Sequence, residues 1–151
     1  MRLPMISSSS GVLRKRRHAA LAEMVAHADR TGSLDAPWEH FPSIWDHFRD
    51  EADILRELHQ DWRTSFAGAV YVAIEQGDGD LQHDVLTAYR SLQRRYAGAR
   101  RLLEHHADHP AIAAVMRKER ALLSSFSILA DSSGTDGPGA AGAAGADTQA
   151  A

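Results

Sequence analysis

The stretch Gln76-Gly77-Asp78-Gly79-Asp80 decides the fold of this chain, because it separates two long amphipathic segments. These segments, residues 43–76 and 81–107, are both predicted to be helices from the spacing of their apolar residues. Two glycines within three residues end the first helix, and Asp78 or Asp80 can cap the second. A connection this short forces the two helices to run antiparallel and side by side. The sequence therefore predicts a long helical hairpin.

Two shorter helices are predicted outside the hairpin. Apolar periodicity places one of them over residues 12–30, and Pro110 suits an early position of the other, which runs to about residue 129. Ser43, with Asp46 three residues later, is predicted to cap the first helix of the hairpin. We therefore expect an all-α fold: an antiparallel helical bundle of three to four helices built on the hairpin.

The ends of the chain differ in composition from its middle. Residues 1–11 contain a serine run followed by a glycine, and residues 131–151 are rich in glycine and alanine and hold no large apolar side chain. Such segments cannot offset their ordering entropy by burial. We expect a disordered N-terminus over residues 1–11, a single helical domain over 12–130 and a disordered tail over 131–151.

The overall composition excludes several classes of protein. The chain has 151 residues, of which 44% are hydrophobic and 25% charged, as is usual for one globular domain. It has no cysteine, which excludes disulfides, zinc–thiolate sites and thiol catalysis. No apolar run approaches the ~20 residues that span a bilayer, and the N-terminus lacks the apolar core of a signal peptide. We expect a cytoplasmic protein with no membrane association.

Aromatic residues crowd the predicted start of the hairpin: Trp38, Phe41, Trp45 and Phe48 lie within eleven residues, together with Ile44. At a loop–helix junction such a group usually closes the end of a bundle core. The alternative is an exposed partner site, because tryptophan is favoured at interfaces.

Charge is unevenly distributed along the chain. Residues 31–84 hold twelve acidic and three basic residues, whereas residues 85–130 hold eight basic and three acidic residues. Helical spacing puts these charges on the outer sides of the hairpin helices: Asp46, Asp50, Asp53 and Glu57 on one, and Arg90, Arg94 and Arg101 on the other. The simplest interpretation is solvated surface. The alternative is two docking surfaces of opposite sign, or self-association that joins the acidic face to the basic one.

One end of the predicted hairpin contains histidine and glutamate residues, the types of residue that bind metal ions. His47 and Glu51 lie one helical turn apart, and the hairpin register brings His106 and His109 to the same level. Imidazole and carboxylate groups in a bundle core can hold a divalent transition metal. The motifs match only fragments of known di-metal patterns, so hydrogen-bonded histidines at a bundle end are the competing interpretation.

A second polar layer is predicted deeper in the bundle. His59 and Glu119 lie on apolar helix faces, and the register places both near Arg95. Buried charges are costly unless they are paired, so we expect these three residues to contact one another and to specify the packing register. A histidine–glutamate pair could also serve acid–base chemistry, but no nucleophile or phosphate loop accompanies it.

The run Arg14-Lys15-Arg16-Arg17 is the strongest basic cluster and could contact nucleic acid or an acidic partner. Against nucleic acid, the whole chain is acidic, with a sequence pI of about 6.3 and no recognition motif. The function that we expect is therefore a non-catalytic interaction module, self-associating or binding another protein, with no cofactor. The alternatives are a metal-binding bundle and a nucleic-acid-associated protein.

Overall fold

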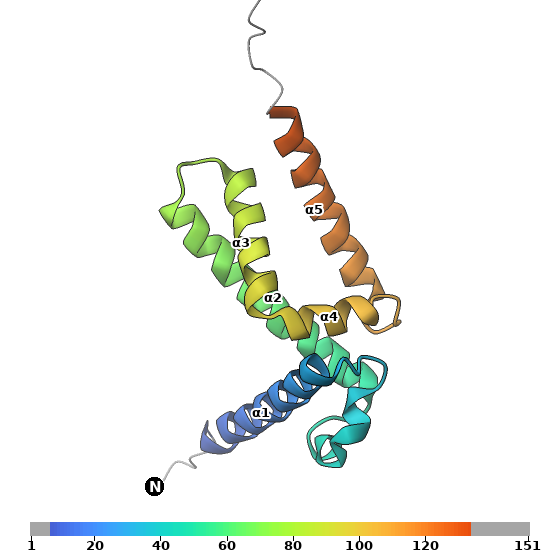
Figure 1. Cartoon of the computed structure of the whole chain (residues 1–151). Coiled ribbons are helices and arrows are strands. Elements are labelled where there is room, and N and C mark those ends of the chain that lie inside the picture. The colour runs from blue at the N-terminus through green and yellow to red at the C-terminus, as the bar shows by residue number, and fades with distance from the viewer. Residues whose placement is uncertain (1–6, 134–151) are drawn as a thin grey trace, which may run out of the picture.

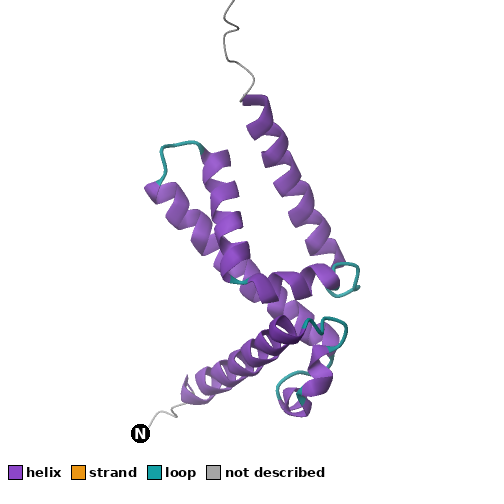
Figure 2. Cartoon of the chain, in the orientation of Figure 1, coloured by secondary structure: helices purple, strands orange, loops and turns teal. Residues whose placement is uncertain are grey.

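The computed structural model of the chain describes residues 7–133, and within this range it contains only helices (Figures 1 and 2). This confirms the predicted all-α class. The five α-helices of the described range are α1 (Ser7–Thr31), α2 (Glu51–Gln76), α3 (Leu81–Arg95), α4 (Ala97–His105) and α5 (Ala113–Ser133), and two short 3-10 helices, η1 (Pro37–His40) and η2 (Pro42–Asp46), join α1 to α2.

The predicted hairpin is present: α2 and α3 lie side by side and antiparallel, joined by the glycine turn (Figure 1). Gly77 follows α2 in an extended conformation, and Gly79 adopts a φ of +97°, which L side chains rarely reach. Asp80 then caps α3, because its side chain accepts a hydrogen bond from the backbone N–H of His83 at 3.0 Å. The turn chemistry read from the sequence therefore produces the hairpin.

The predicted start of the first hairpin helix is wrong. Ser43 lies within η2, and α2 begins only at Glu51. The cap is Asp50, whose carboxylate accepts a hydrogen bond from the N–H of Asp53 at 2.7 Å. The intervening segment leaves helical geometry so that Phe48 can enter the core, where it is 2% exposed.

The single helix predicted over residues 81–107 is also wrong. The chain breaks at Tyr96, which has a φ of −119° and a ψ of 42°, and α4 leaves in a new direction (Figure 1). The break lets α4 pack on α1, where Gly98 approaches Asp29 so closely that a Cβ on the glycine would lie 2.9 Å from the Asp29 Cβ. Packing of α4 against α1 therefore overrides the continuous helical pattern of the sequence.

The outer helices have different bounds from those predicted. Helix α1 begins at Ser7, five residues before the expected start, so residues 7–11, which were predicted to be disordered, are helical in the structure. Helix α5 begins at Ala113 and includes residues 131–133, which were assigned to the tail. The predictions of disorder for residues 1–6 and 134–151 lie outside the described residues.

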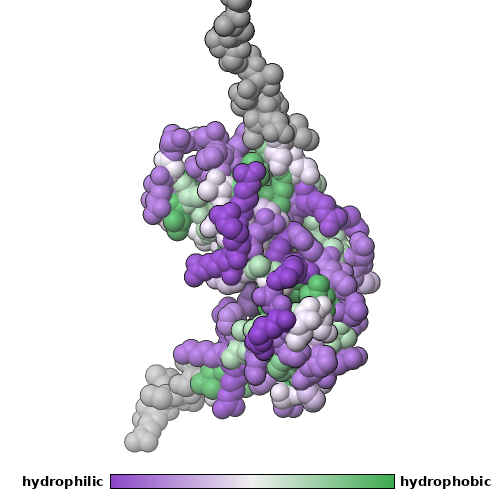
Figure 3. All heavy atoms as spheres, viewed as in Figure 1, coloured by the Kyte–Doolittle hydropathy of each residue, from purple (hydrophilic) through white to green (hydrophobic). Residues whose placement is uncertain are grey.

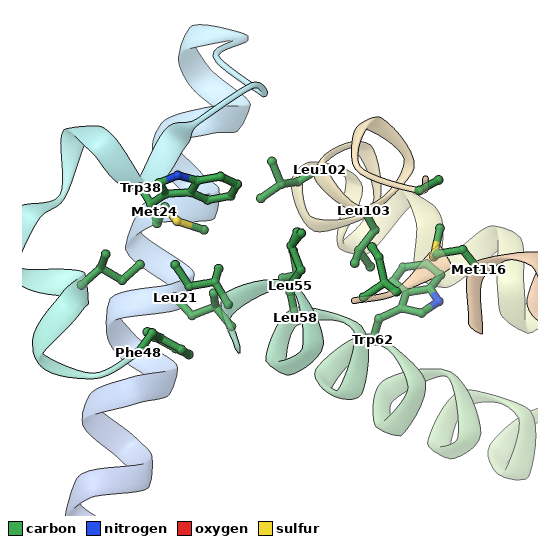
Figure 4. Packing of buried hydrophobic residues seen from close by; sticks show 14 of the residues in the cluster. Leu21, Met24, Trp38, Phe48, Leu55, Leu58, Trp62, Leu102, Leu103 and Met116 are labelled. Carbon is green, nitrogen blue, oxygen red and sulfur yellow. The ribbon is translucent and has the colours of Figure 1, made fainter. Parts of the chain in front are cut away.

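The hydrophobic core runs along the first half of α2 (Figure 4). Leu55, Leu58 and Trp62 point from α2 towards the other elements. On one side they meet residues of α1 and of the segment that follows it: Leu21, Met24, Trp38 and Phe48. On the other side they meet Leu102 and Leu103 of α4 and Met116 of α5. The core therefore joins all the elements through α2.

The second half of α2 extends past this core with only α3 beside it (Figure 1). Helix α5 packs on α3, and α1 packs on α4 and on the 3-10 segment. Among the helices, α3 and α4 therefore pack directly on α2, while α1 packs mainly on α4 and α5 mainly on α3. Within the described part of the chain, no helix combines the length and apolar character that crossing a membrane requires.

Candidate functional site

Arg100, which is buried, forms the centre of a charged cluster. Its Nε donates a hydrogen bond to Glu104 at 2.7 Å, and its Nη1 donates one to Glu119 of α5. Glu119 also accepts a hydrogen bond from the indole Nε1 of Trp62 at 3.1 Å. The guanidinium carbon of Arg100 lies 5.0 Å from the Trp62 ring and 5.4 Å from the Tyr89 ring. We call these five residues the arginine cluster.

The arginine cluster corrects the predicted polar layer. Glu119 is largely buried and ion-paired, as expected, and His59 lies close enough for its protonation to respond to Glu119. Arg95 is not the partner: it is exposed, and its guanidinium stacks over the Tyr96 ring at 5.4 Å. The break at Tyr96 turns α4 so that Arg100 points inward instead. The spacing of Arg100 and Glu104 by four residues was the sequence signal for this pair.

Burial perturbs the ionisable groups around the arginine cluster. Burial lowers the pKa of His59, and the charges of Arg63 and Arg100 lower it further while Glu119 opposes them. Burial also raises the pKa of Tyr89. Burial alone would lower the pKa of Arg100, but hydrogen bonds to its two glutamates raise the pKa above its ordinary value. The arginine is therefore held as a cation between two carboxylates.

Histidines gather at the end of the molecule where α1, η1 and α4 meet. His106 contacts the carbonyl oxygen of Leu34 at 2.8 Å, and His105 contacts Asp35 at 2.7 Å. Burial lowers the pKa of His106, opposed by its hydrogen bond to Leu34. These contacts fasten the segment that follows α1 to the end of α4.

The predicted metal residues are brought together only in part. His109 accepts a hydrogen bond at Nδ1 from the N–H of Ala111, and its Nε2 lies 3.5 Å from Glu51. His106 is engaged with Leu34, and the backbone carbonyl of His47 accepts a hydrogen bond from Arg17. Among the residues that the structure describes, no group of three or more histidines and carboxylates could hold a metal ion. The geometry matches the competing interpretation of hydrogen-bonded histidines.

The basic segment divides into two parts. Arg14, Lys15 and Arg16 are exposed on α1, and their proposed contact with an acidic partner stays a prediction. Arg17 instead packs against the start of α2. Its Nη1 donates to the carbonyl of His47 at 2.9 Å, its Nη2 lies 3.2 Å from Glu57, and its guanidinium lies 4.5 Å from the Phe48 ring centre. Arg17 therefore helps to hold α1 on α2.

The aromatic cluster mostly closes the core, as the simpler interpretation predicted. Trp38, Ile44 and Phe48 are buried and Phe41 is half-buried. Trp45 departs from this pattern, because 43% of its surface is exposed.

A groove of about 460 Å³ lies between α1, the middle of α2 and the corner that joins α3 to α4. Its floor includes Leu21 and Trp62, and Arg94 and Arg95 contribute to its lining at the corner. The carboxylate of Asp61 on its α2 side is paired with His18 at 3.1 Å. Figure 3 shows the molecule hollowed between α1 and the hairpin.

The outer side of the second half of α2 is an uncharged, exposed surface. A helix turns roughly 100° per residue, which places Tyr71 opposite Trp62 and Phe66, the residues that face the core. We call this surface the outer stripe, and its exposed members are Thr64, Ala67, Gly68, Tyr71, Val72 and Ile74. In Figure 3 hydrophobic atoms are visible over this end of the hairpin. The sequence analysis missed the stripe because it followed only the core-facing side of this helix and gave Tyr71, Val72 and Ile74 no place on either side.

Comparisons of the chain with protein-family models, with curated proteins and with solved structures gave no match.

Proposed function

We propose that this chain is a non-catalytic interaction module that binds another protein through the outer stripe of α2. The observation that supports this proposal is the exposure of three large apolar side chains within four residues: Tyr71 is 67% exposed, Val72 50% and Ile74 49%. At roughly 100° per residue, Ile74 neighbours Tyr71 on the helix surface and Val72 lies at the opposite edge of the stripe. An exposed apolar patch of this kind is typical of a binding surface. Tyrosine is also among the residues enriched where interfaces gain most of their affinity.

The arrangement of the charged groups supports a non-catalytic role. The polar atoms of the arginine cluster are directed at one another, because Arg100 is shared between two carboxylates and Glu119 also accepts from Trp62. A catalytic acid or base has to reach a substrate proton, whereas the charged groups of the cluster that line the hollow beside Tyr89, namely Arg100 and Glu104, are already paired with each other. The cluster instead joins α2, α4 and α5 at Trp62, just before the outer stripe begins.

A photo-cross-linking amino acid in place of Tyr71 tests the proposal. In cells that produce the full chain, irradiation should give discrete adducts from the Tyr71 position. The matched control carries the same amino acid in place of Ser91, which is exposed on α3. Adducts from position 71 and none from position 91 would support the outer stripe as the binding surface. No adduct from position 71, or equal adducts from both positions, would refute it.

A further inference from the structure

We infer that the partner of the outer stripe is a second copy of this chain, bound antiparallel about a two-fold axis near the middle of the stripe. The inference rests on the proposed function and identifies the partner for the same surface. In a two-fold interface both copies use the same surface. If one residue contacts a second residue of the other copy, the second residue also contacts the first one of that copy, so the surface must be complementary to itself. The outer stripe has this property in its shape and in its charge.

The shape complementarity comes from a large side chain next to two small ones. Tyr71 projects from the stripe one helical turn beyond Ala67 and Gly68. A Cβ built on Gly68 would meet nothing within 4 Å, so the space above the glycine is open. When two such helices lie antiparallel and centred between residues 67 and 71, each Tyr71 lies over Ala67 and Gly68 of the other copy. Small residues at these positions also let the two backbones approach closely.

The charge complementarity comes from the two ends of the stripe. Arg63 precedes the stripe, Glu75 follows it, and both are exposed. The antiparallel arrangement that seats Tyr71 also brings Arg63 of one copy to the same height as Glu75 of the other, on the two flanks of the contact and at both of its ends. A parallel arrangement would place like charges beside each other, which is unfavourable. The charges therefore select the same orientation as the side-chain shapes.

The stripe between Arg63 and Glu75 is also free of charged side chains, which suits burial against a second copy. Residues 64–74 carry no ionisable side chain other than the phenol of Tyr71, so the contact buries no unpaired charge. The stripe also lies opposite the side of α2 that packs on α3, so the fold leaves it free for contact with another molecule.

Charge reversal at the two ends of the stripe tests the inference. Sedimentation velocity of the purified full chain should show a dimer whose proportion rises with concentration and falls with added salt. Arg63→Glu alone and Glu75→Arg alone should each weaken the dimer by at least about tenfold, because each places like charges together twice. The variant that carries both changes should recover the affinity of the unchanged chain. Arg90→Glu, on the exposed side of α3, is the matched control and should have no effect.

The outcomes separate this inference from the proposed function. A purified chain that stays monomeric up to about 1 mM overturns the inference, and so does a double variant that remains as weak as the single ones. If the chain is monomeric while position 71 still forms cross-links in cells, the stripe binds a different protein and the proposed function stands. If position 71 forms no cross-link, both proposals fail. Circular dichroism of each variant shows that the helices remain folded.

Discussion

Arg100 shows how a single residue can connect three helices. Its guanidinium binds Glu104 on its own helix and Glu119 on α5, while its plane lies near the Trp62 ring on α2. We expect Glu119→Ala to lower the free energy of unfolding by about 3–5 kcal/mol, because it leaves a buried cation and the Trp62 N–H without their acceptor. Urea unfolding followed by circular dichroism measures this difference.

Glu104→Ala is the matched control for this prediction. Its side chain also binds Arg100 but is half-exposed, so water can replace it, and the expected loss is about 1 kcal/mol or less. Equal losses for the two variants would show that burial of the Arg100–Glu119 pair is not the source of its strength.

Two histidines make the stability of the fold depend on pH. Burial lowers the pKa of both His59 and His106 from the ordinary value of 6.5, so the unfolded chain binds protons more readily at these sites than the folded one. Their contribution to stability is therefore fully present above pH 6.5 and is lost as the pH falls through their folded pKa values. We expect the melting temperature to fall between about pH 7.5 and 5.5.

The double variant His59→Gln and His106→Gln tests the origin of this dependence. His59 is surrounded by Glu119, Arg63 and Arg100, and His106 by His105, His109 and Glu51 together with the Leu34 carbonyl. With both imidazoles removed, the fall in melting temperature over this pH range should be smaller than in the unchanged chain. A fall of the same size would assign the dependence to other groups.

For single residues, the sequence predicted which polar side chains are buried better than it predicted which residues they contact. Glu119 was identified because it interrupts an apolar face, but its arginine partner was misassigned to Arg95. The pairing depended on a straight helix through residue 96, and the break there changes which arginine points inward. In the same way, Glu51 was expected level with His106, whereas the structure places its carboxylate 3.5 Å from His109.

Among the elements, the start of α2 gives a direct test of the revised helix boundary. Asp50→Ala removes the side chain that accepts from the N–H of Asp53, and should lower the free energy of unfolding by about 1 kcal/mol. Asp50→Asn should retain most of that stability, because asparagine caps helices equally well. Ser43→Ala, at the cap predicted from the sequence, should change little. A larger loss at Ser43 than at Asp50 would contradict the observed start.

Helix α4 lies against α1 at a glycine. Gly98→Ala places a Cβ 2.9 Å from the Asp29 Cβ, so one helix has to move, and we expect a loss of about 1–3 kcal/mol. Gly11→Ala is the matched control: it also lies in a helix, but its added Cβ meets nothing within 4 Å. This change should stabilise the chain by about 0.5–1 kcal/mol. Thermal unfolding of the two variants should therefore shift in opposite directions.

Local sequence signals predicted an element correctly where no packing contact with a distant part of the chain overrode them. The turn between α2 and α3 followed from Gly77, Gly79 and the capping Asp80 alone, and the structure confirms it. The breaks at residues 47–50 and at Tyr96 could not be read locally, because they serve contacts with α1, which lies far away in the sequence. Apolar periodicity in the sequence identifies the buried face of a helix, but it does not identify the residue at which the helix breaks so that this face can pack on another element.

Across the whole molecule, stability is distributed unevenly along α2. The first half of this helix carries Leu55, Leu58 and Trp62, which join the core between α1 and α4. The second half is supported by α3 on one side and carries the exposed outer stripe on the other. The part that we propose as the binding surface is therefore the least enclosed part of the helix.

Amide hydrogen exchange should reveal this gradient. At concentrations too low for the proposed dimer to form, amides of residues 70–76 should exchange faster than those of residues 54–62, because segments with few buried contacts open at lower free energy. Raising the concentration should slow exchange at residues 64–75 selectively, because a second copy then covers the outer stripe. The Tyr71→Asp variant should keep the gradient but lose its dependence on concentration, since it places a charge in the centre of the contact. Uniform exchange along α2 would contradict the gradient, and slowing elsewhere on the molecule would place the contact on another surface.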